Sequence, residues 1–319
     1  MPDSKKFIVS HAPFVHDGSS IAARRYQVFL ALVPAAVAGI VQWGQPALSV
    51  ICLAVGSAML WELGFNKVSR QQPTIGNGDA ALIGMTLAML LPATAPWWMV
   101  VTGTFLAVTI GKQIYGGIGA NPFNPVAVSV AILSISWKIH MDFDAALLAL
   151  DPGFTMLEPL TAAKAFGAAT THRFAAVDLL LGHQAGAIGA PFGIWILLGG
   201  IYLVVCGIVR WEIPAAFIVG VIITAVAFNI ADPARYAGPA FHLLTGYTLI
   251  GAFFLATEDS SSPVNTLPML IFGFAGGLMT VLIRNIGAYP DGVIQAILVI
   301  NLINPLVDKI RPRALGKVT

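Results

Sequence analysis

Apolar stretches of about the length of a membrane span recur along nearly the whole sequence, and this recurrence limits the possible folds more than any other feature. A helix needs about 20 apolar residues to cross the roughly 30 Å hydrocarbon core of a bilayer. Of the 319 residues, 57% are hydrophobic and only 10% are charged, whereas about 25% of residues are charged in a typical soluble domain. The sequence therefore predicts an all-α integral membrane protein.

Ten transmembrane helices can be placed on these apolar stretches. Several of them are shorter than about 20 residues, so tilted or broken helices are expected. The predicted spans cover residues 27–43, 47–65, 79–93, 96–113, 123–137, 190–208, 213–230, 241–257, 267–283 and 292–307.

Positive charges in the connecting segments predict the orientation. Lys and Arg gather before the first predicted span and after the second, fourth, sixth and tenth. Under the positive-inside rule, these segments and both termini are cytoplasmic. Arg284, near the outer end of the ninth span, is an exception. We expect a multi-pass inner-membrane protein with the Glu258–Asp259 loop on the cytoplasmic side.

Charge and cysteine usage exclude several classes of partner and cofactor. The formal net charge is +2, so there is no basic excess that would indicate a nucleic-acid partner. Cys52 and Cys206 lie within apolar runs and lack the spacing of a zinc, iron–sulfur or haem site. His172 and His183 have no third ligand patterned around them, so no metal site is predicted.

Two short sequence matches indicate an internal repeat. Leu82-Ile83-Gly84 matches Leu249-Ile250-Gly251, an offset of 249 − 82 = 167, and Gly119 to Pro122 resembles Gly287 to Pro290, an offset of 287 − 119 = 168. Each pair occupies the same place in a unit of five spans. Because five is odd, the second unit enters the membrane from the opposite side, which predicts two inverted five-helix repeats.

This repeat divides the chain into five segments. Residues 138–189 contain no convincing span and separate the two repeats on the outer face, where an otherwise symmetric protein has room for extra chemistry. The predicted segments are a cytoplasmic N-terminal segment (1–26), the first repeat (27–137), the extracytoplasmic insertion (138–189), the second repeat (190–307) and a cytoplasmic tail (308–319).

Residues 116–125 read Gly-Gly-Ile-Gly-Ala-Asn-Pro-Phe-Asn-Pro, which predicts an interruption of helix, because two prolines and three glycines disfavour continuous helix. The segment is either a tight turn between helices or the lining of a ligand site. In the second case Asn121 and Asn124 are candidate cofactor-binding residues, since a helix start offers free backbone N–H groups to a polar ligand.

Several motifs, in the same order along the whole chain, resemble the RnfD family, which is similar to the B subunit of the sodium-pumping NADH:quinone reductase. Lys112 to Pro125 resembles the KQxYGGxGxNxFNPA stretch of that family, and Gly251 to Pro263 resembles GAFFIATDPVSSP. Further likenesses are Ser10 to Pro13, Asp178 to Gly189 and Gly287 to Gly292.

The resemblance implies a membrane electron-transfer subunit of an ion-translocating ferredoxin:NAD⁺ oxidoreductase complex, partnered by the other Rnf subunits and the lipid membrane. It also implies FMN joined through its phosphate to a threonine in a motif like TMATPL. Thr155, Pro159 and Leu160 match that motif, but Glu158 stands at the threonine position, with Lys164 nearby. A carboxylate cannot form the phosphoester. We therefore expect non-covalent FMN, the alternatives being attachment to Thr155, Thr170 or Thr171 and loss of the flavin.

Two other functions stay open from the sequence. An inverted repeat with few intramembrane charges also fits a channel or transporter for small solutes, and a chain without flavin could serve as an anchor for redox partners. The ordered motifs and the long outer insertion favour electron transfer. A second flavin, riboflavin, near the inner face and the identity of the coupling ion, Na⁺ or H⁺, are left undecided.

Overall fold

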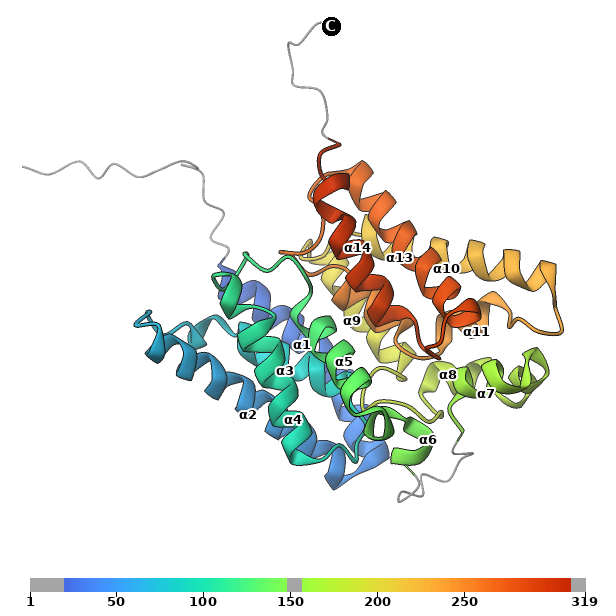
Figure 1. Ribbon diagram of the computed structural model, residues 1–319, viewed down its shortest axis with the longest axis horizontal. Coiled ribbons are helices and arrows are strands. Elements are labelled where there is room, and N and C mark those ends of the chain that lie inside the picture. The colour runs from blue at the N-terminus through green and yellow to red at the C-terminus, as the bar shows by residue number, and fades with distance from the viewer. Residues whose placement is uncertain (1–19, 148–156, 311–319) are drawn as a thin grey trace, which may run out of the picture.

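A computed structural model describes residues 20–147 and 157–310. All regular secondary structure in these two ranges is helical, as the apolar pattern predicts (Figure 1). The α-helices are α1 (Ile21–Trp43), α2 (Gln45–Val68), α3 (Asp79–Leu90), α4 (Trp97–Phe105), α5 (Pro125–Ser136), α6 (Phe143–Ala146), α7 (Pro159–Phe166), α8 (Ala176–Leu181), α9 (Gly193–Val205), α10 (Glu212–Ala231), α11 (Pro239–Leu244), α12 (Thr248–Ile250), α13 (Thr266–Ile286) and α14 (Val293–Val307).

Four helices in the described ranges, α1, α2, α10 and α13, are long and apolar enough to cross a membrane. Four more, α3, α5, α9 and α14, are apolar but only 10–17 residues long. The other two predicted spans are composite. Helix α4 continues as a π-helix over Leu106–Ile110, and α12 continues as a π-helix over Gly251–Leu255. The expectation of short and broken helices is thus confirmed.

The predicted span 241–257 is broken in its outer half, between α11 and α12. Gly246 has a φ of +62°, a left-handed conformation that glycine adopts without steric cost. A Cβ at this position would lie 2.3 Å from Oδ2 of Asp291. The same carboxylate oxygen accepts a hydrogen bond from the Tyr247 N–H at 2.6 Å. The break therefore depends on a residue without a side chain and on a buried acceptor beside it.

The glycine-rich segment 116–125 is not a continuous helix, which confirms the predicted interruption. Gly116, Gly117 and Gly119 all have positive φ angles. Helix α5 starts only at Pro125, and the Asn124 side chain caps it by accepting hydrogen bonds from the first backbone N–H groups of the helix. Proline at the first helical position and asparagine before it are both favourable for a helix start.

Helices far apart in the sequence pack side by side. Helix α1 contacts α9, α5 contacts α14, and α2 contacts both α3 and α4. The most extensive contact joins α10 and α13, where glycines allow a close approach: a Cβ on Gly277 would lie 2.0 Å from the Phe217 carbonyl oxygen. Small residues at such contacts are typical of helix packing in membranes.

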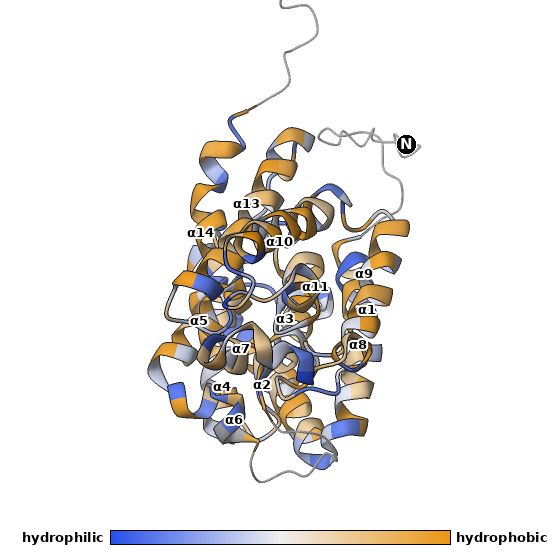
Figure 2. Cartoon of the chain, turned by 90° about the vertical axis from the view of Figure 1, so that its right-hand side faces the viewer, coloured by the Kyte–Doolittle hydropathy of each residue, from blue (hydrophilic) through white to orange (hydrophobic). Residues whose placement is uncertain are grey.

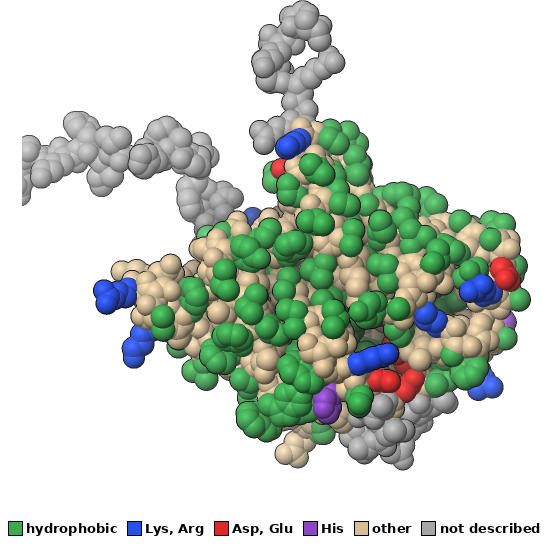
Figure 3. Space-filling model, in the orientation of Figure 1, with side chains coloured by type: hydrophobic (Ala, Val, Ile, Leu, Met, Phe, Trp, Pro, Cys, Tyr) green, Lys and Arg blue, Asp and Glu red, His purple; other side chains and the backbone are tan. Residues whose placement is uncertain are grey.

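The outer surface of the helices is largely apolar. In Figure 2 the helices are coloured mostly as hydrophobic, and in Figure 3 hydrophobic side chains cover most of the face shown. Leu60, Val41 and Val205 are 69%, 81% and 80% exposed. A contiguous surface of this kind is stable against lipid rather than water, which supports a membrane protein.

In its described parts, the insertion between the predicted repeats contains only short helices: α6, α7 and α8 have 4, 8 and 6 residues. After α8 the chain runs against the C-terminal end of α3. Ile188 N donates to the Leu91 carbonyl at 2.9 Å and Ala190 N to the Met89 carbonyl at 3.1 Å. This loop satisfies backbone acceptors at the end of a 12-residue helix that would otherwise end unpaired in a buried place.

Candidate functional site

Four charged side chains from separate segments meet where the first spans have their predicted cytoplasmic ends. Lys112, which is 1% exposed, donates to Glu62 Oε1 at 3.0 Å and to Asp79 Oδ2 at 2.7 Å. Arg25 donates to the other oxygen of Asp79 at 2.9 Å. Each charge therefore has an opposite partner, as burial of charge requires. We call Arg25, Glu62, Asp79 and Lys112 the inner ion cluster.

Sequence reasoning missed the inner ion cluster. From the sequence, Lys112 serves only as a marker of topology, and Glu62 is only an isolated carboxylate near a span end. The available signal was that Glu62, Asp79 and Lys112 all lie at the same predicted end of neighbouring spans. Which of them make contact depends on how α2, α3 and α4 pack, and spacing along the chain does not reveal this.

Asn121 and Asn124, predicted as ligand-lining residues, both border a pocket beside the inner ion cluster. Asn124 Nδ2 donates to the Leu255 carbonyl at 3.0 Å, and Asn121 Nδ2 donates to Glu258 Oε2 at 3.2 Å. The interrupted segment is thus tied to the inner end of the broken eighth span. Burial raises the pKa of Glu258, against the opposing effects of the Ser261 hydrogen bond and of the Arg25 charge.

This inner pocket is small and its charges are balanced. Its cavity volume is about 60 Å³, which is room for about two water molecules and much less than the 300 Å³ or more of a typical ligand pocket. The charged side chains that line it are Arg24, Arg25, Lys112, Asp79, Glu258 and Asp259. Three cations face three carboxylates, so the pocket suits water or an uncharged group better than a phosphate.

On the predicted outer side, Glu158 is 9% exposed and directly precedes α7. Its backbone N–H donates to Asp144 Oδ1 at 2.6 Å, and its carboxylate accepts a hydrogen bond from the Thr161 hydroxyl. Burial raises the pKa of Glu158 to about 8; the Thr161 hydrogen bond lowers it, and the nearby Asp291 and Asp144 charges raise it. The position expected to hold a flavin phosphate is thus occupied by a buried acid among other acids.

The other predicted outer residues fall into separate places. Pro159 and Leu160 are buried and line the same small cavity as Glu158. Thr170 and Thr171 donate their hydroxyls to the carbonyls of Gly167 and Ala168 at 2.6 Å each.

Two predicted residues stand apart from this cavity. Lys164 Nζ lies 2.5 Å from the Gly287 carbonyl and 2.8 Å from the Tyr289 carbonyl, and it lines a different cleft. Thr155 lies outside the described residues. The structure therefore unites Glu158 with Pro159 and Leu160, and not with Lys164, Thr170 or Thr171.

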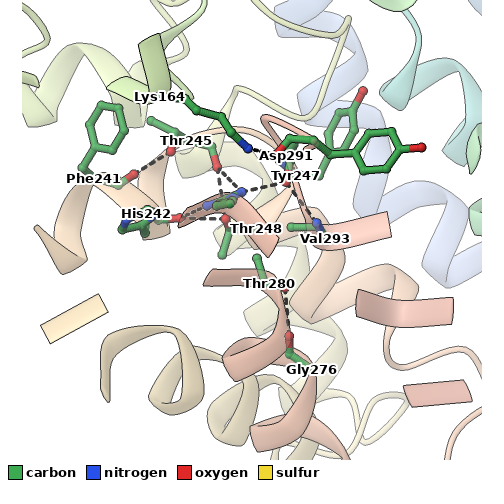
Figure 4. A network of polar contacts seen from close by, with 12 residues as sticks. Lys164, Phe241, His242, Thr245, Tyr247, Thr248, Gly276, Thr280, Asp291 and Val293 are labelled. Atoms are coloured by element: carbon green, nitrogen blue, oxygen red, sulfur yellow. Dashed lines mark hydrogen bonds and ion pairs between the residues drawn. The ribbon is translucent and has the colours of Figure 1, made fainter. Parts of the chain in front are cut away.

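A polar network not foreseen from the sequence surrounds Arg284, which is 3% exposed (Figure 4). Its guanidinium donates to Asp291 Oδ1 at 2.9 Å and to the carbonyls of His242 and Thr245 at 2.7 and 3.3 Å. These carbonyls lie at the end of α11, where the helix break leaves them without helical partners. The outlying positive charge in the sequence thus stabilises the broken eighth span.

The cavity at Glu158 does not fit a flavin phosphate. It encloses only about 10 Å³, and Asp291 lines it together with Glu158. A phosphate there would face two carboxylates without an unpaired cation, because the Arg284 guanidinium is already bound to Asp291. The hydroxyl needed for a phosphoester is also absent from position 158.

Comparison with known proteins gives one consistent result. The chain matches the family described as NQR2, RnfD, RnfE over residues 8–316. It is 36% identical over 310 residues to the D subunit of the proton-translocating ferredoxin:NAD(+) oxidoreductase complex of Clostridium ljungdahlii, covering 95% of this chain and 94% of the relative. It is 34% identical over 314 residues to the D subunit of the Na(+)-translocating complex of Acetobacterium woodii, covering 98% and 95%.

A third relative supports the same assignment. The D subunit of the ion-translocating oxidoreductase complex of Stutzerimonas stutzeri is 34% identical over 329 residues, covering 94% of this chain and 93% of the relative. The likeness thus spans almost the full length of each protein, in agreement with the ordered motifs of the sequence. The chain belongs to the NQR2, RnfD, RnfE family.

Proposed function

We propose that this chain is the D-type membrane subunit of an ion-translocating ferredoxin:NAD⁺ oxidoreductase complex, acting together with the other subunits of that complex. The observation that carries the proposal is the likeness over 94–98% of the chain to three relatives whose names state this role. An electron-transfer role is favoured over a solute channel, because fold alone does not distinguish the two whereas the relatives' names do.

We further propose that ten spans form two inverted five-helix repeats with cytoplasmic termini. Corresponding positions carry corresponding devices, which supports the proposal. The fourth and ninth spans end near the buried cations Lys112 and Arg284. The fifth and tenth spans begin after Asn124 and Asp291, whose side chains accept hydrogen bonds from the first backbone N–H groups of α5 and α14.

In this topology the inner ion cluster and the network around Arg284 lie at opposite ends of the bundle. Ionisable groups inside a membrane domain commonly mark ion or proton routes. We propose that both belong to the Na⁺ or H⁺ path of the complex. Glu62 Oε2 and both nitrogens of the His242 ring are buried without a hydrogen-bond partner among the described residues, which is consistent with groups that exchange a proton or contact water.

For the cofactor, we propose FMN held without a covalent bond in the outer region. A bound flavin would supply the one-electron chemistry that these side chains lack. Because Glu158 and its cavity exclude the phosphate, FMN would bind beside the Glu158 cavity and not within it. Riboflavin at the inner face is a weaker proposal, since the charge-balanced inner pocket suits an uncharged flavin only after the surrounding segments move apart.

The test uses the complex purified from its native membrane with an affinity tag on this chain. We expect ferredoxin-dependent NAD⁺ reduction to copurify with the chain. We expect acid precipitation to release FMN into the supernatant and leave a non-fluorescent band for this protein on a denaturing gel. Flavin retained in the pellet and mapped by peptide mass to Thr155, Thr170 or Thr171 would refute the non-covalent proposal, and absence of any oxidoreductase activity would refute the functional one.

A further inference from the structure

A second outer cavity lies against α7, between the loop that precedes α11 and the end of α13. Its volume is about 410 Å³, within the range of small-ligand pockets. The charged residues that line it are Lys164, Arg235 and Arg284, and no acidic residue lines it in the described part of the chain. We call this cavity the outer cleft.

Two of these cations are available to a ligand. Arg235 forms no ion pair with a carboxylate of the described residues, and its guanidinium carbon lies 5.3 Å from the centre of the Tyr236 ring. The Lys164 ammonium contacts two carbonyl oxygens, which leaves one of its three N–H donors free. Burial lowers the pKa of Lys164, the direction expected where no carboxylate offsets desolvation.

Buried polar atoms without partners also border the outer cleft. His242 is 3% exposed, and neither ring nitrogen has a hydrogen-bond partner among the described residues. The same holds for Nε of Arg284 and Nδ2 of Asn285. Figure 4 shows His242 and Lys164 on opposite sides of the Arg284 network. Buried polar groups are nearly always paired with protein, water or a ligand, and those left free here include N–H donors of Arg and Asn.

We propose that the outer cleft binds the phosphate of an anionic ligand, either the headgroup of an anionic phospholipid or the phosphate of FMN. Arg and Lys donors bind phosphate oxygens through charge-assisted hydrogen bonds. A cation is excluded, since the cleft has no carboxylate among its described lining residues. The FMN alternative rests on the proposed function, and the lipid alternative does not.

The position of the cleft is compatible with both sources. Phe166 and Ile286, near its rim, are 71% and 70% exposed, and exposed apolar side chains at a predicted span end suit the acyl region of a lipid. Tyr236 and Phe241 form part of its lining, and aromatic side chains suit a flavin ring. The acidic Glu158 cavity lies close by, because Leu160 lines both cavities, so a phosphate is directed to one of the two.

The test measures ligand binding to the purified complex with the full-length chain. One arm compares FMN with riboflavin, which lacks the phosphate, by fluorescence titration after removal of bound flavin. The other arm compares retention of phosphatidylglycerol with phosphatidylcholine in nanodiscs by native mass spectrometry. Wild type is compared with Lys164→Gln/Arg235→Gln, with the charge-preserving Lys164→Arg/Arg235→Lys, and with Arg173→Gln, an exposed cation that does not line the cleft.

We expect the anionic ligand of at least one arm to bind wild type and to lose tenfold or more in affinity in the double Gln variant only. If phosphatidylglycerol responds and FMN does not, the cleft is a lipid site and the non-covalent FMN proposal fails independently. The inference is overturned if neither arm discriminates the anionic ligand, or if Arg173→Gln weakens binding as much as the double variant does. A double Gln variant that does not fold leaves the charge-preserving variant, which must bind the ligand.

Discussion

The inner ion cluster allows a quantitative test of how buried charges hold this fold together. In Lys112→Met a side chain of similar length replaces the ammonium, so Glu62 loses its cation while Asp79 keeps Arg25. Removing one partner of a buried ion pair costs about 3–5 kcal/mol, because the other charge is left uncompensated. The Thr74 hydroxyl still donates to Glu62 at 2.5 Å, so we expect about 3 kcal/mol, the lower end of that range.

Each 1 kcal/mol lowers Tm by about 2–4 °C in chains of 150–250 residues. We therefore expect Lys112→Met to unfold about 6 °C or more below wild type in detergent, followed by tryptophan fluorescence. Adding Glu62→Gln removes the orphaned charge and is expected to restore at least half of the loss. Lys67→Met, at an exposed position near the end of α2, is the matched control and should stay within about 0.5 kcal/mol of wild type. The reasoning is refuted if Lys112→Met unfolds like the control, or if Glu62→Gln gives no recovery.

Three further predictions use other parts of the molecule. Because the pKa of Glu158 is raised from 4.5 to about 8, the folded state holds a proton that the unfolded chain releases. Its contribution to stability is therefore full below about pH 4.5 and falls as the pH rises through about 8; a Tm–pH profile should lose this fall in Glu158→Gln, and an unchanged profile would contradict it. Gly277→Ala should destabilise by about 1–3 kcal/mol through overpacking, since its Cβ would meet the Phe217 carbonyl, whereas Gly56→Ala, with open space around it, should be neutral or stabilising in the same unfolding assay. In a Cys52→Ser/Cys206→Ser background, an impermeant maleimide added to intact cells should label Ala145→Cys but not Leu315→Cys, and labelling of both from one side would reject the topology.

The sequence predicted most accurately those features that a local pattern determines. The interruption at 116–125 follows from the conformational limits of glycine and proline, and it appears as a loop with Asn124 capping α5. The break at Gly246 follows from the sequence only as a general tendency to broken helices. Its position depends on Asp291, a residue 45 positions later that accepts the Tyr247 N–H, and no local pattern encodes such a contact.

The ionisable groups show the limit of reading a membrane protein from spans alone. Lys112 and Arg284 both lie at predicted span ends, where the positive-inside rule treats a charge as a marker of orientation. In the structure both are buried and bind partners from other spans. A charge at a span end therefore has two readings, and only the packing of short helices such as α3 decides between them.

Glu158 shows how a single position couples these arguments. The resemblance located the residue correctly, and simple chemistry excluded a phosphoester there. The structure adds that the surroundings are acidic as well, because Asp144 and Asp291 raise the pKa of this carboxyl together with burial. Restoring a threonine would remove one negative charge and leave the others in place. We therefore expect Glu158→Thr alone to accept a covalent flavin poorly, since the incoming phosphate would still approach Asp291, whereas the cationic outer cleft offers that phosphate an oppositely charged site nearby.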